Sequence, residues 1–199
     1  GDGTFQQLPP VYTYVWMVHE GVSGDFNRDG RLDFALAAGN RILTALGNGN
    51  GTFQPVKTFY GPSYSYPVGM ESADLNRDGY PDIITAFSSN NNYTLYTLMG
   101  SPDGNFSVYH SSAVPATPSS PWWMYTKDFD MDGNTDLLWG GAIYFGDRTG
   151  MFAKRVEACR DCGNVFPADC NRDGYEDLAY IRDNRLGVMF GDGSGKFSA

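Results

Sequence analysis

The sequence predicts an all-β protein, a β-propeller built from four four-stranded blades, and three observations support this prediction. A nine-residue motif, D-x-[N/D]-x-D-G-x-x-D, occurs four times, beginning at Asp25, Asp74, Asp128 and Asp169. A Gly-rich turn that closes on Phe occurs between the copies, which is a hairpin signal. No segment shows a sustained 3.6-residue apolar period with helix caps. The motifs begin 49, 54 and 41 residues apart, a period typical of propeller blades.

Each period predicts four short strands. The first leads into the acidic motif, as at 68–74, and the second leaves it, beginning at Phe34, Ile83, Leu137 and Leu178. The third precedes the Gly-rich turn, and the fourth begins at the Phe that closes the turn. The predicted third strands cover 42–47, 93–100, 142–146 and 186–191, and the turns cover 1–5, 49–53, 102–106, 148–152 and 193–197. Apolar runs in the second strands are typical of sheets buried on both faces.

These strands predict a single repeat domain over residues 1–199. The blades are expected at approximately 11–58, 59–112, 113–157 and 158–199. Residues 1–10 repeat the turn and the start of a fourth strand, so we expect them to complete an outer strand.

Composition restricts the class of partner. The formal net charge is −9, but the four motifs contribute 13 aspartates to the 23 acidic residues. Four bound dications would bring the charge close to zero, so the acidity indicates metal chemistry. Basic residues are too scattered for a phosphate-binding stripe, which argues against nucleic acid. The sequence also lacks the run of about 18 apolar residues that a membrane span requires.

The acidic motif has the chemistry of a calcium loop. Carboxylate or amide oxygens stand at positions 1, 3, 5 and 9, and the Gly at position 6 permits a sharp turn, which suits a hard cation with six to eight oxygen ligands. The motif is not an EF-hand, which needs a bidentate Glu at position 12. That position holds Leu36, Thr85, Trp139 and Tyr180.

The motif and the turn, seen most fully in FGDGSGKF at 190–197, resemble the FG-GAP or VCBS family of calcium-binding blade repeats. Members include the propeller of integrin α subunits, fungal lectins, and modules of secreted enzymes. The resemblance implies about four structural Ca²⁺ ions, one per loop. It implies side-chain ligands at Asp25, Asn27, Asp29, Asp33, Asp74, Asn76, Asp78, Asp82, Asp128, Asp130, Asp132, Asp136, Asp169, Asn171, Asp173 and Asp177. Position 7 is expected to contribute its backbone carbonyl, at Arg31, Tyr80, Asn134 and Tyr175.

The number of repeats departs from the family, whose complete propellers usually resemble seven- or eight-bladed rings. Residues 4–8 could supply the outer strand of the last blade and close a small ring. They could equally pair with another chain, giving a half-propeller dimer or an open, filament-like assembly, because an unpaired edge invites such addition. The sequence leaves these alternatives open.

Three cysteines lie in the last repeat. We expect a local disulfide between Cys159 and Cys162, although a redox CxxC motif is the alternative. Cys170 occupies position 2 of its motif, where the other copies carry Phe26, Leu75 and Phe129, and is expected to be a small buried residue.

Three N-glycosylation acceptors occur, at Asn50, Asn92 and Asn105, and all three fall in Gly/Asn-rich turns. Calcium sites of extracellular modules are often too weak for cytosolic calcium levels. We therefore expect an extracellular or cell-surface protein.

An aromatic segment precedes each predicted first strand, at 11–16, 63–67, 121–125 and, more weakly, 164–167. The family resemblance implies that these segments lie opposite the calcium loops. Such clusters suit stacking on sugar rings or on a protein partner, although packing between blades is an alternative. Neighbouring strand residues point to opposite faces, so Trp122 and Trp123 cannot both be buried easily. The candidate ligand residues are Tyr14, Tyr66, Trp122 and Trp123.

These features favour a non-enzymatic, calcium-stabilised extracellular recognition module that binds glycan or protein. A structural repeat unit of a glycosylated assembly or filament is the first alternative. The second is a propeller module of a secreted polysaccharide-degrading enzyme. His19 and His110 fall in different repeats, without a recognisable nucleophile motif, which argues against an enzyme.

Overall fold

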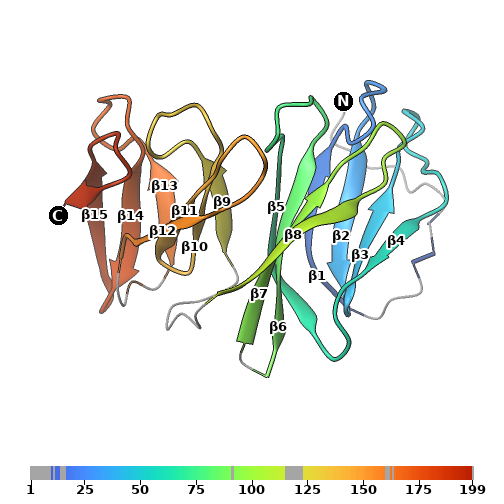
Figure 1. Ribbon diagram of the computed structural model, residues 1–199, viewed down its shortest axis with the longest axis horizontal. Coiled ribbons are helices and arrows are strands. Elements are labelled where there is room, and N and C mark those ends of the chain that lie inside the picture. Colours follow the sequence, from blue (N-terminus) through green and yellow to red (C-terminus); the bar gives the residue numbers. More distant parts are fainter. Residues whose placement is uncertain are drawn as a thin grey trace, which may run out of the picture.

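The computed structural model describes residues 10, 12–13, 17–90, 92–114, 123–159, 162 and 164–198. Within these residues sixteen strands form four four-stranded antiparallel sheets, and there is no helix (Figure 1). The prediction of an all-β fold made of four four-stranded blades is confirmed. The outer strand expected from residues 1–10 falls outside the described residues, apart from Pro10.

Each sheet uses four consecutive strands of the chain. Blade 1 comprises β1 (Val18–Gly24), β2 (Asp33–Ala38), β3 (Arg41–Ala45) and β4 (Lys57–Tyr60). Blade 2 comprises β5 (Tyr66–Ala73), β6 (Asp82–Ser89), β7 (Asn92–Met99) and β8 (Ser107–Val114). Blade 3 comprises β9 (Met124–Lys127), β10 (Asp136–Trp139), β11 (Ala142–Phe145) and β12 (Lys154–Glu157). Blade 4 comprises β13 (Val165–Ala168), β14 (Asp177–Arg182), β15 (Arg185–Gly191) and β16 (Phe197–Ser198).

Sharp turns join these strands. The hairpins between the second and third strands contain residues with positive φ, such as Gly39 at 60° and Asn90 at 50°. Gly and Asn are the residues that adopt this conformation most readily. The acidic motif joins the first strand to the second in every blade, and the Gly-rich turn joins the third to the fourth. Because neighbouring strands are antiparallel, both connections lie at the same end of each sheet, the upper edge in Figure 1.

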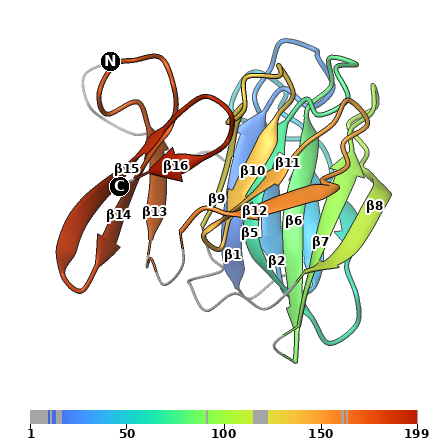
Figure 2. The ribbon, with the colours of Figure 1, turned by 60° about the vertical axis from the view of Figure 1, so that its left-hand side comes forward.

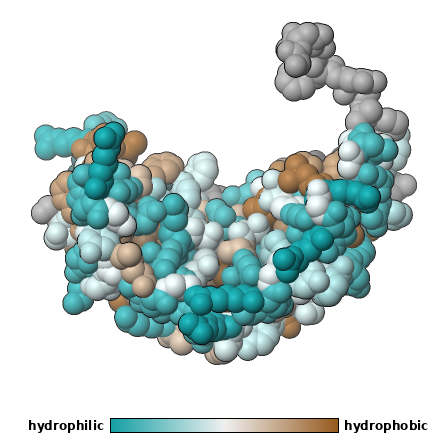
Figure 3. Space-filling view, turned by 90° about the horizontal axis from the view of Figure 1, so that it is seen from above, coloured by the Kyte–Doolittle hydropathy of each residue, from teal (hydrophilic) through white to brown (hydrophobic). Residues whose placement is uncertain are grey.

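The four sheets stand side by side along an arc (Figures 1 and 2). First strands of adjacent blades contact one another, β1 against β5 and β5 against β9. Seen from above, the molecule is a crescent with one hollowed side (Figure 3). The described residues therefore do not close into a small ring, which was one of the predicted alternatives. No described helix is long and apolar enough to span a membrane.

Alternation along the second strand builds the core between blades. The tenth position, counted from the first Asp of the motif, faces the preceding blade, and the eleventh position faces the following one. Ile83 thus packs with Ala35 and Ile42 of blade 1. Its neighbour Ile84 packs with Leu137 of blade 3. Second strands are therefore apolar on both faces because a sheet covers each face.

Candidate metal loops and ligand surface

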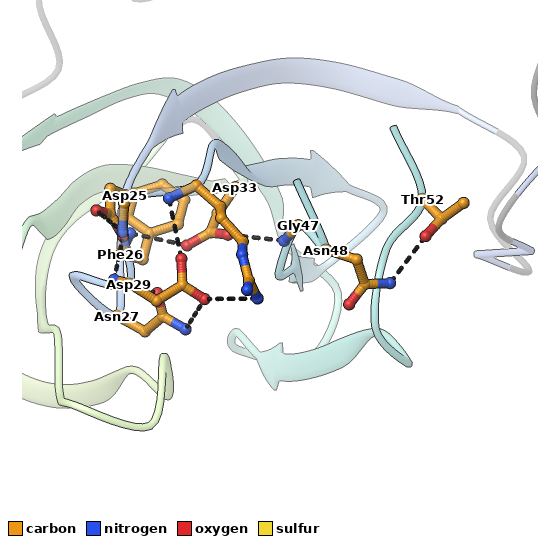
Figure 4. Close-up of polar contacts among 10 residues, drawn as sticks. Asp25, Phe26, Asn27, Asp29, Asp33, Gly47, Asn48 and Thr52 are labelled. Atoms are coloured by element: carbon orange, nitrogen blue, oxygen red, sulfur yellow. Dashed lines mark hydrogen bonds and ion pairs between the residues drawn. The ribbon is translucent and has the colours of Figure 1, made fainter. Parts of the chain in front are cut away.

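The last aspartate of each motif is fully buried and joins the acidic loop to the Gly-rich turn. In blade 1, Asp33 Oδ2 accepts the Phe26 N–H at 2.9 Å and Oδ1 accepts the Gly47 N–H at 2.7 Å (Figure 4). The same pair of hydrogen bonds occurs in the other three blades, at Asp82, Asp136 and Asp177. All four carboxylates are 0% exposed. Position 9 therefore has a structural role in addition to the ligand role predicted for it.

The glycine at or just beyond the end of each third strand was not identified from the sequence as part of this arrangement. A Cβ on Gly47 would lie 2.2 Å from the Leu32 carbonyl oxygen, closer than two atoms can approach. The equivalent distances are 2.3, 2.1 and 2.2 Å, at Gly100, Gly146 and Gly191. The first Gly of the FG-x-G-x-G-x-F turn is thus required by contact with the acidic loop, and its recurrence in four repeats was the available signal.

Positions 1, 3 and 5 of the motif bend the loop around their own side chains. In blade 1 the Asp29 N–H donates to Asn27 Oδ1 at 3.2 Å, and the Gly30 N–H donates to Asp25 Oδ2 at 2.8 Å (Figure 4). The backbone is left-handed at Arg28, with φ of 59°, and at Gly30, with φ of 82°. The same two left-handed positions occur in the other three loops, and Gly at the second avoids strain there.

The loop of blade 3 brings three carboxylates to one point. One oxygen each of Asp128, Asp130 and Asp136 lies within 4.8 Å of the other two. Asp128 Oδ1 is buried and accepts no hydrogen bond, and the same is true of Asp74 Oδ1 in blade 2. A buried, unpaired carboxylate oxygen is costly. Calcium prefers oxygen ligands of this kind, so the donor sets of these two loops fit the cation.

The electrostatics of the loops agree with this fit. Burial raises the pKa of Asp82 to about 6, and burial raises the pKa of Asp136 to about 6, against the backbone hydrogen bonds that favour ionisation. Burial, together with repulsion from Asp132, raises the pKa of Asp130. A dication would offset this cost by pairing with the ionised carboxylates.

Position 4 connects one loop to the next, which the sequence analysis missed. The Arg28 guanidinium of blade 1 lies over the Tyr80 ring of blade 2, 5.7 Å from its centroid. Arg77 Nη2 of blade 2 donates to Asn134 Oδ1 of blade 3 at 3.3 Å. The signal was present, since Arg occupies position 4 in three motifs. Position 7, for which only a backbone carbonyl role was predicted, is the side-chain contact point for this arginine in blades 2 and 3.

The described parts of the aromatic segments at 63–67, 123–125 and 164–167 lie at the starts of the first strands, at the sheet end opposite the acidic loops. Tyr66 is 43% exposed and Trp123 is 47% exposed, whereas Met124, the neighbour of Trp123, is buried. Tyr14 and Trp122 are outside the described residues. Phe166, which was not predicted to be a ligand residue, is 39% exposed, with its ring 6.4 Å from that of Trp123.

Two acidic side chains lie near Tyr125, the ring that adjoins Phe166. Burial, with repulsion from Glu71, raises the pKa of Glu20 to about 7. Burial also raises the pKa of Glu71. Tyr125, 5.9 Å from the Phe166 ring, has a pKa raised by burial and then by the charges of Glu71 and Glu20. The first strands thus combine flat aromatic surface with half-buried carboxyl groups.

The cysteines gave one expected and one unexpected result. Cys159 and Cys162 form a disulfide, with their Cα atoms 5.7 Å apart. Cys170 is a free thiol and is exposed, so the prediction that it is buried was wrong. Its counterparts Phe26 and Phe129 are covered by the turn Phe of the following blade, and no described blade follows blade 4. The glycosylation acceptors are all exposed: Asn50, Asn92 and Asn105.

Comparison with known proteins agrees with the repeat pattern and the fold. The sequence profile of the FG-GAP-like repeat matches residues 25–85 and 74–139. No curated protein sequence matches the chain.

Three solved structures illustrate its structural neighbours. The exotype rhamnogalacturonan lyase YesX has a TM-score of 0.59 at 12% identity, covering 90% of this chain and 37% of the lyase. The rhamnogalacturonan lyase PL11 of Bacillus licheniformis has a TM-score of 0.58 at 13% identity, covering 90% and 38%. An Agrocybe aegerita lectin specific for non-reducing terminal N-acetylglucosamine has a TM-score of 0.44 at 16% identity, covering 92% and 66%. The chain therefore spans little more than a third of the lyases it matches, and the likeness concerns the fold.

Proposed function

Because the chain belongs to the FG-GAP-like repeat family, we propose that it is a calcium-stabilised, non-enzymatic recognition module of the extracellular space that binds glycan or an extracellular protein. The observation that supports this most directly is the group of exposed aromatic rings at the starts of three first strands. Tyr66, Trp123 and Phe166 expose their rings at the starts of β5, β9 and β13. Exposed rings of this kind stack on the apolar faces of sugars or anchor a protein partner.

The carboxyl groups beside the rings favour glycan over protein. Glu20 and Glu71 are half-buried and lie close enough to Tyr125 to shift its pKa. Carboxylates accept hydrogen bonds from hydroxyl groups, and a sugar presents hydroxyl groups around an apolar ring face. Fixed polar groups beside flat apolar ones are typical of small-ligand sites.

In the proposed module the acidic loops are structural. Each loop would hold calcium through the oxygens at motif positions 1, 3, 5 and 9, together with the carbonyl at position 7. The bound cation supplies positive charge that offsets the repulsion among the loop carboxylates. The loops lie at the sheet end opposite the aromatic group, so calcium would maintain the blades without touching the ligand.

An extracellular location is consistent with two observations. Disulfides such as Cys159–Cys162 persist in oxidising compartments. The acceptors Asn50, Asn92 and Asn105 are exposed, as glycan attachment requires.

A second candidate is a module of a polysaccharide-degrading enzyme, and one observation favours it. Glu20, with a pKa of about 7, lies near Tyr125, and a carboxyl with such a pKa is suited to general acid–base catalysis. His19 lies in β1 and stacks on Tyr66, with ring centroids 6.2 Å apart, whereas His110 lies in β8, the outer strand of blade 2. We retain recognition as the proposed function, because the exposed rings support it directly.

The test is a glycan array followed by calorimetry on Trp123→Ala. We expect a loss of affinity of about tenfold, because the variant loses the buried area of the ring as well as the roughly 0.5–1.5 kcal/mol that stacking contributes beyond that area. Tyr109→Ala is the matched control, because Tyr109 is 50% exposed on β8, the outer strand of blade 2. Equal losses in both variants, or no bound glycan and no bound extracellular protein, would reject the proposal. Depolymerisation of a bound polysaccharide would select the enzyme instead.

A further inference from the structure

The four acidic loops differ from one another at motif positions 1 and 3. Position 3 is Asn in blades 1, 2 and 4, whereas it is Asp130 in blade 3. The blade 3 loop therefore presents four carboxylates at the predicted ligand positions, and each of the other loops presents three. The affinity of a calcium site depends on the number of charged ligands and on the rigidity of the site. Both properties vary among the loops of this chain.

In blades 1 and 4 the first aspartate of the motif is fully engaged by its own loop. Asp25 Oδ1 accepts the Asp29 N–H at 3.0 Å. Asp169 Oδ1 accepts the Arg172 N–H at 2.6 Å. The positive end of an N–H dipole thus lies at the oxygen that a cation would take. Calcium binding through this oxygen requires these two loops to rearrange.

In blades 2 and 3 one oxygen of the first aspartate is available. Asp74 Oδ1 and Asp128 Oδ1 are buried and accept no hydrogen bond within the described residues. The other oxygen of each carboxylate is held by the loop glycine, through the Gly79 N–H at 2.9 Å and the Gly133 N–H at 2.8 Å. These carboxylates are therefore already oriented. A buried, unpaired oxygen costs free energy, so a cation here removes a penalty and breaks no hydrogen bond at this oxygen.

Blade 3 also brings its ligand oxygens together. Oxygens of Asp128, Asp130 and Asp136 lie within 4.8 Å of one another, and no other group of three His, Cys, Asp or Glu side chains in the described part of the chain does so. Calcium–oxygen distances are 2.3–2.6 Å, so two ligands on opposite sides of the ion are about 5 Å apart. The turn of blade 4 packs on this loop, since a Cβ on Gly195 would lie 3.6 Å from Asp130 Cβ. The blade 3 loop is thus close to a binding geometry and is supported from outside.

Two other features of the loops do not change this ranking. Position 5 does not distinguish them, because its Oδ2 accepts a side-chain amide N–H in all four loops. Lys154 places a positive charge near Asp130 and so competes with a cation. However, burial and the charges of Asp132 and Asp128 raise the pKa of Asp130 by more than the Lys154 charge lowers it. The negative charge of the loop therefore dominates at Asp130.

We propose that calcium fills the loops of this chain in a fixed order, with blade 3 first, blade 2 second, and blades 1 and 4 last. Blade 3 combines the fourth carboxylate, Asp130, with the available oxygen of Asp128. Blade 2 has the available oxygen of Asp74 without a fourth carboxylate, and blades 1 and 4 have neither. This order rests on the calcium role given to the loops in the proposed function. It adds that, at limiting calcium, blades 2 and 3 are loaded while blades 1 and 4 are not.

The test is calcium titration of the full chain, followed by calorimetry and native mass spectrometry, in the parent and in two reciprocal variants. Asp130→Asn gives blade 3 the residue of the other loops, and Asn76→Asp gives blade 2 a fourth carboxylate. We expect the parent to bind its first ion at least about tenfold more tightly than its last. Asp130→Asn raises the dissociation constant of the first step about tenfold, whereas Asn76→Asp lowers that of the second step.

Asn171→Asp is the matched control, because it adds a carboxylate to blade 4, where Asp169 Oδ1 already accepts a hydrogen bond. It should leave the first step unchanged. Circular dichroism in EDTA should be the same for all variants, since Asp and Asn have nearly the same shape. Four ions with one common dissociation constant, or a first step insensitive to Asp130→Asn, would overturn the order and leave the calcium role intact. A parent that binds no calcium would overturn both.

Discussion

Asp74→Asn distinguishes a metal ligand from a solvated acidic turn, because its expected effect depends on calcium. Asp74 Oδ2 accepts the Gly79 N–H at 2.9 Å, a hydrogen bond that the Asn oxygen can replace. Asp74 Oδ1 is buried and has no partner in the described structure. Without metal, the substitution removes an unpaired charge and keeps the hydrogen bond.

The expected magnitudes follow from these contacts. In EDTA the free energy of unfolding should change by no more than about 1 kcal/mol, the contribution of one hydrogen bond. In calcium at a hundredfold excess over the dissociation constant, one site contributes about 2.7 kcal/mol, which the variant loses. At roughly 2–4 °C per kcal/mol for a domain of this size, the thermal midpoint in calcium falls by about 5–10 °C.

The assay is thermal unfolding in calcium and in EDTA, with native mass spectrometry to count bound ions. Asp183→Asn is the matched control, because Asp183 lies in the β14–β15 hairpin with φ of 51°, which Asn also adopts. The control should leave both midpoints unchanged, and Asp74→Asn should lose one bound ion. Equal shifts in calcium and in EDTA would refute metal ligation by Asp74.

Three other substitutions test the remaining features. Glu20→Gln should raise stability above pH 7 and have little effect below pH 4.5, because the folded pKa of Glu20, about 7, exceeds the model-compound value of 4.5. The parent therefore loses stability as pH rises between these values, and parallel stability profiles of parent and variant from pH 4 to 8 would contradict this. Gly100→Ala should lower the free energy of unfolding in urea by about 1–3 kcal/mol, because the methyl group would lie 2.3 Å from the Pro81 carbonyl oxygen. An unchanged urea midpoint would show that the turn moves freely. Arg77→Met should lower the free energy of unfolding by less than about 1 kcal/mol. The loss should be greater in EDTA than in calcium, since the Arg77 charge near Asn134 offsets loop carboxylates that calcium would otherwise neutralise. An equal loss in both conditions would argue against this role.

The repeat pattern predicted the strands because both depend on local sequence. Four acidic motifs and four turns locate the ends of every second and third strand, and the apolar runs between them are long enough for one strand each. The second strand of blade 2, expected from Ile83, is β6, and it begins one residue earlier at Asp82. The predicted disulfide between Cys159 and Cys162 is equally local, since the two cysteines are three positions apart in the sequence.

Apart from the turn glycine, the features that sequence reasoning missed depend on contacts between blades. Cys170 was expected to be buried by analogy with Phe26, but burial at that position requires a following blade. The arginine contacts at position 4 likewise join residues from different repeats. Phe166 joined the aromatic group only once β13 was placed beside β9, because its own segment carries a single aromatic residue.

The contact pattern between blades also governs how the array unfolds. Each blade covers its apolar faces only with its immediate neighbours, so the array behaves as a chain of nearest-neighbour couplings, as repeat proteins do. Among the described residues, blades 2 and 3 have two such couplings, whereas blades 1 and 4 have one. Amide hydrogens should therefore exchange fastest in the two end blades and slowest in β6 and β10.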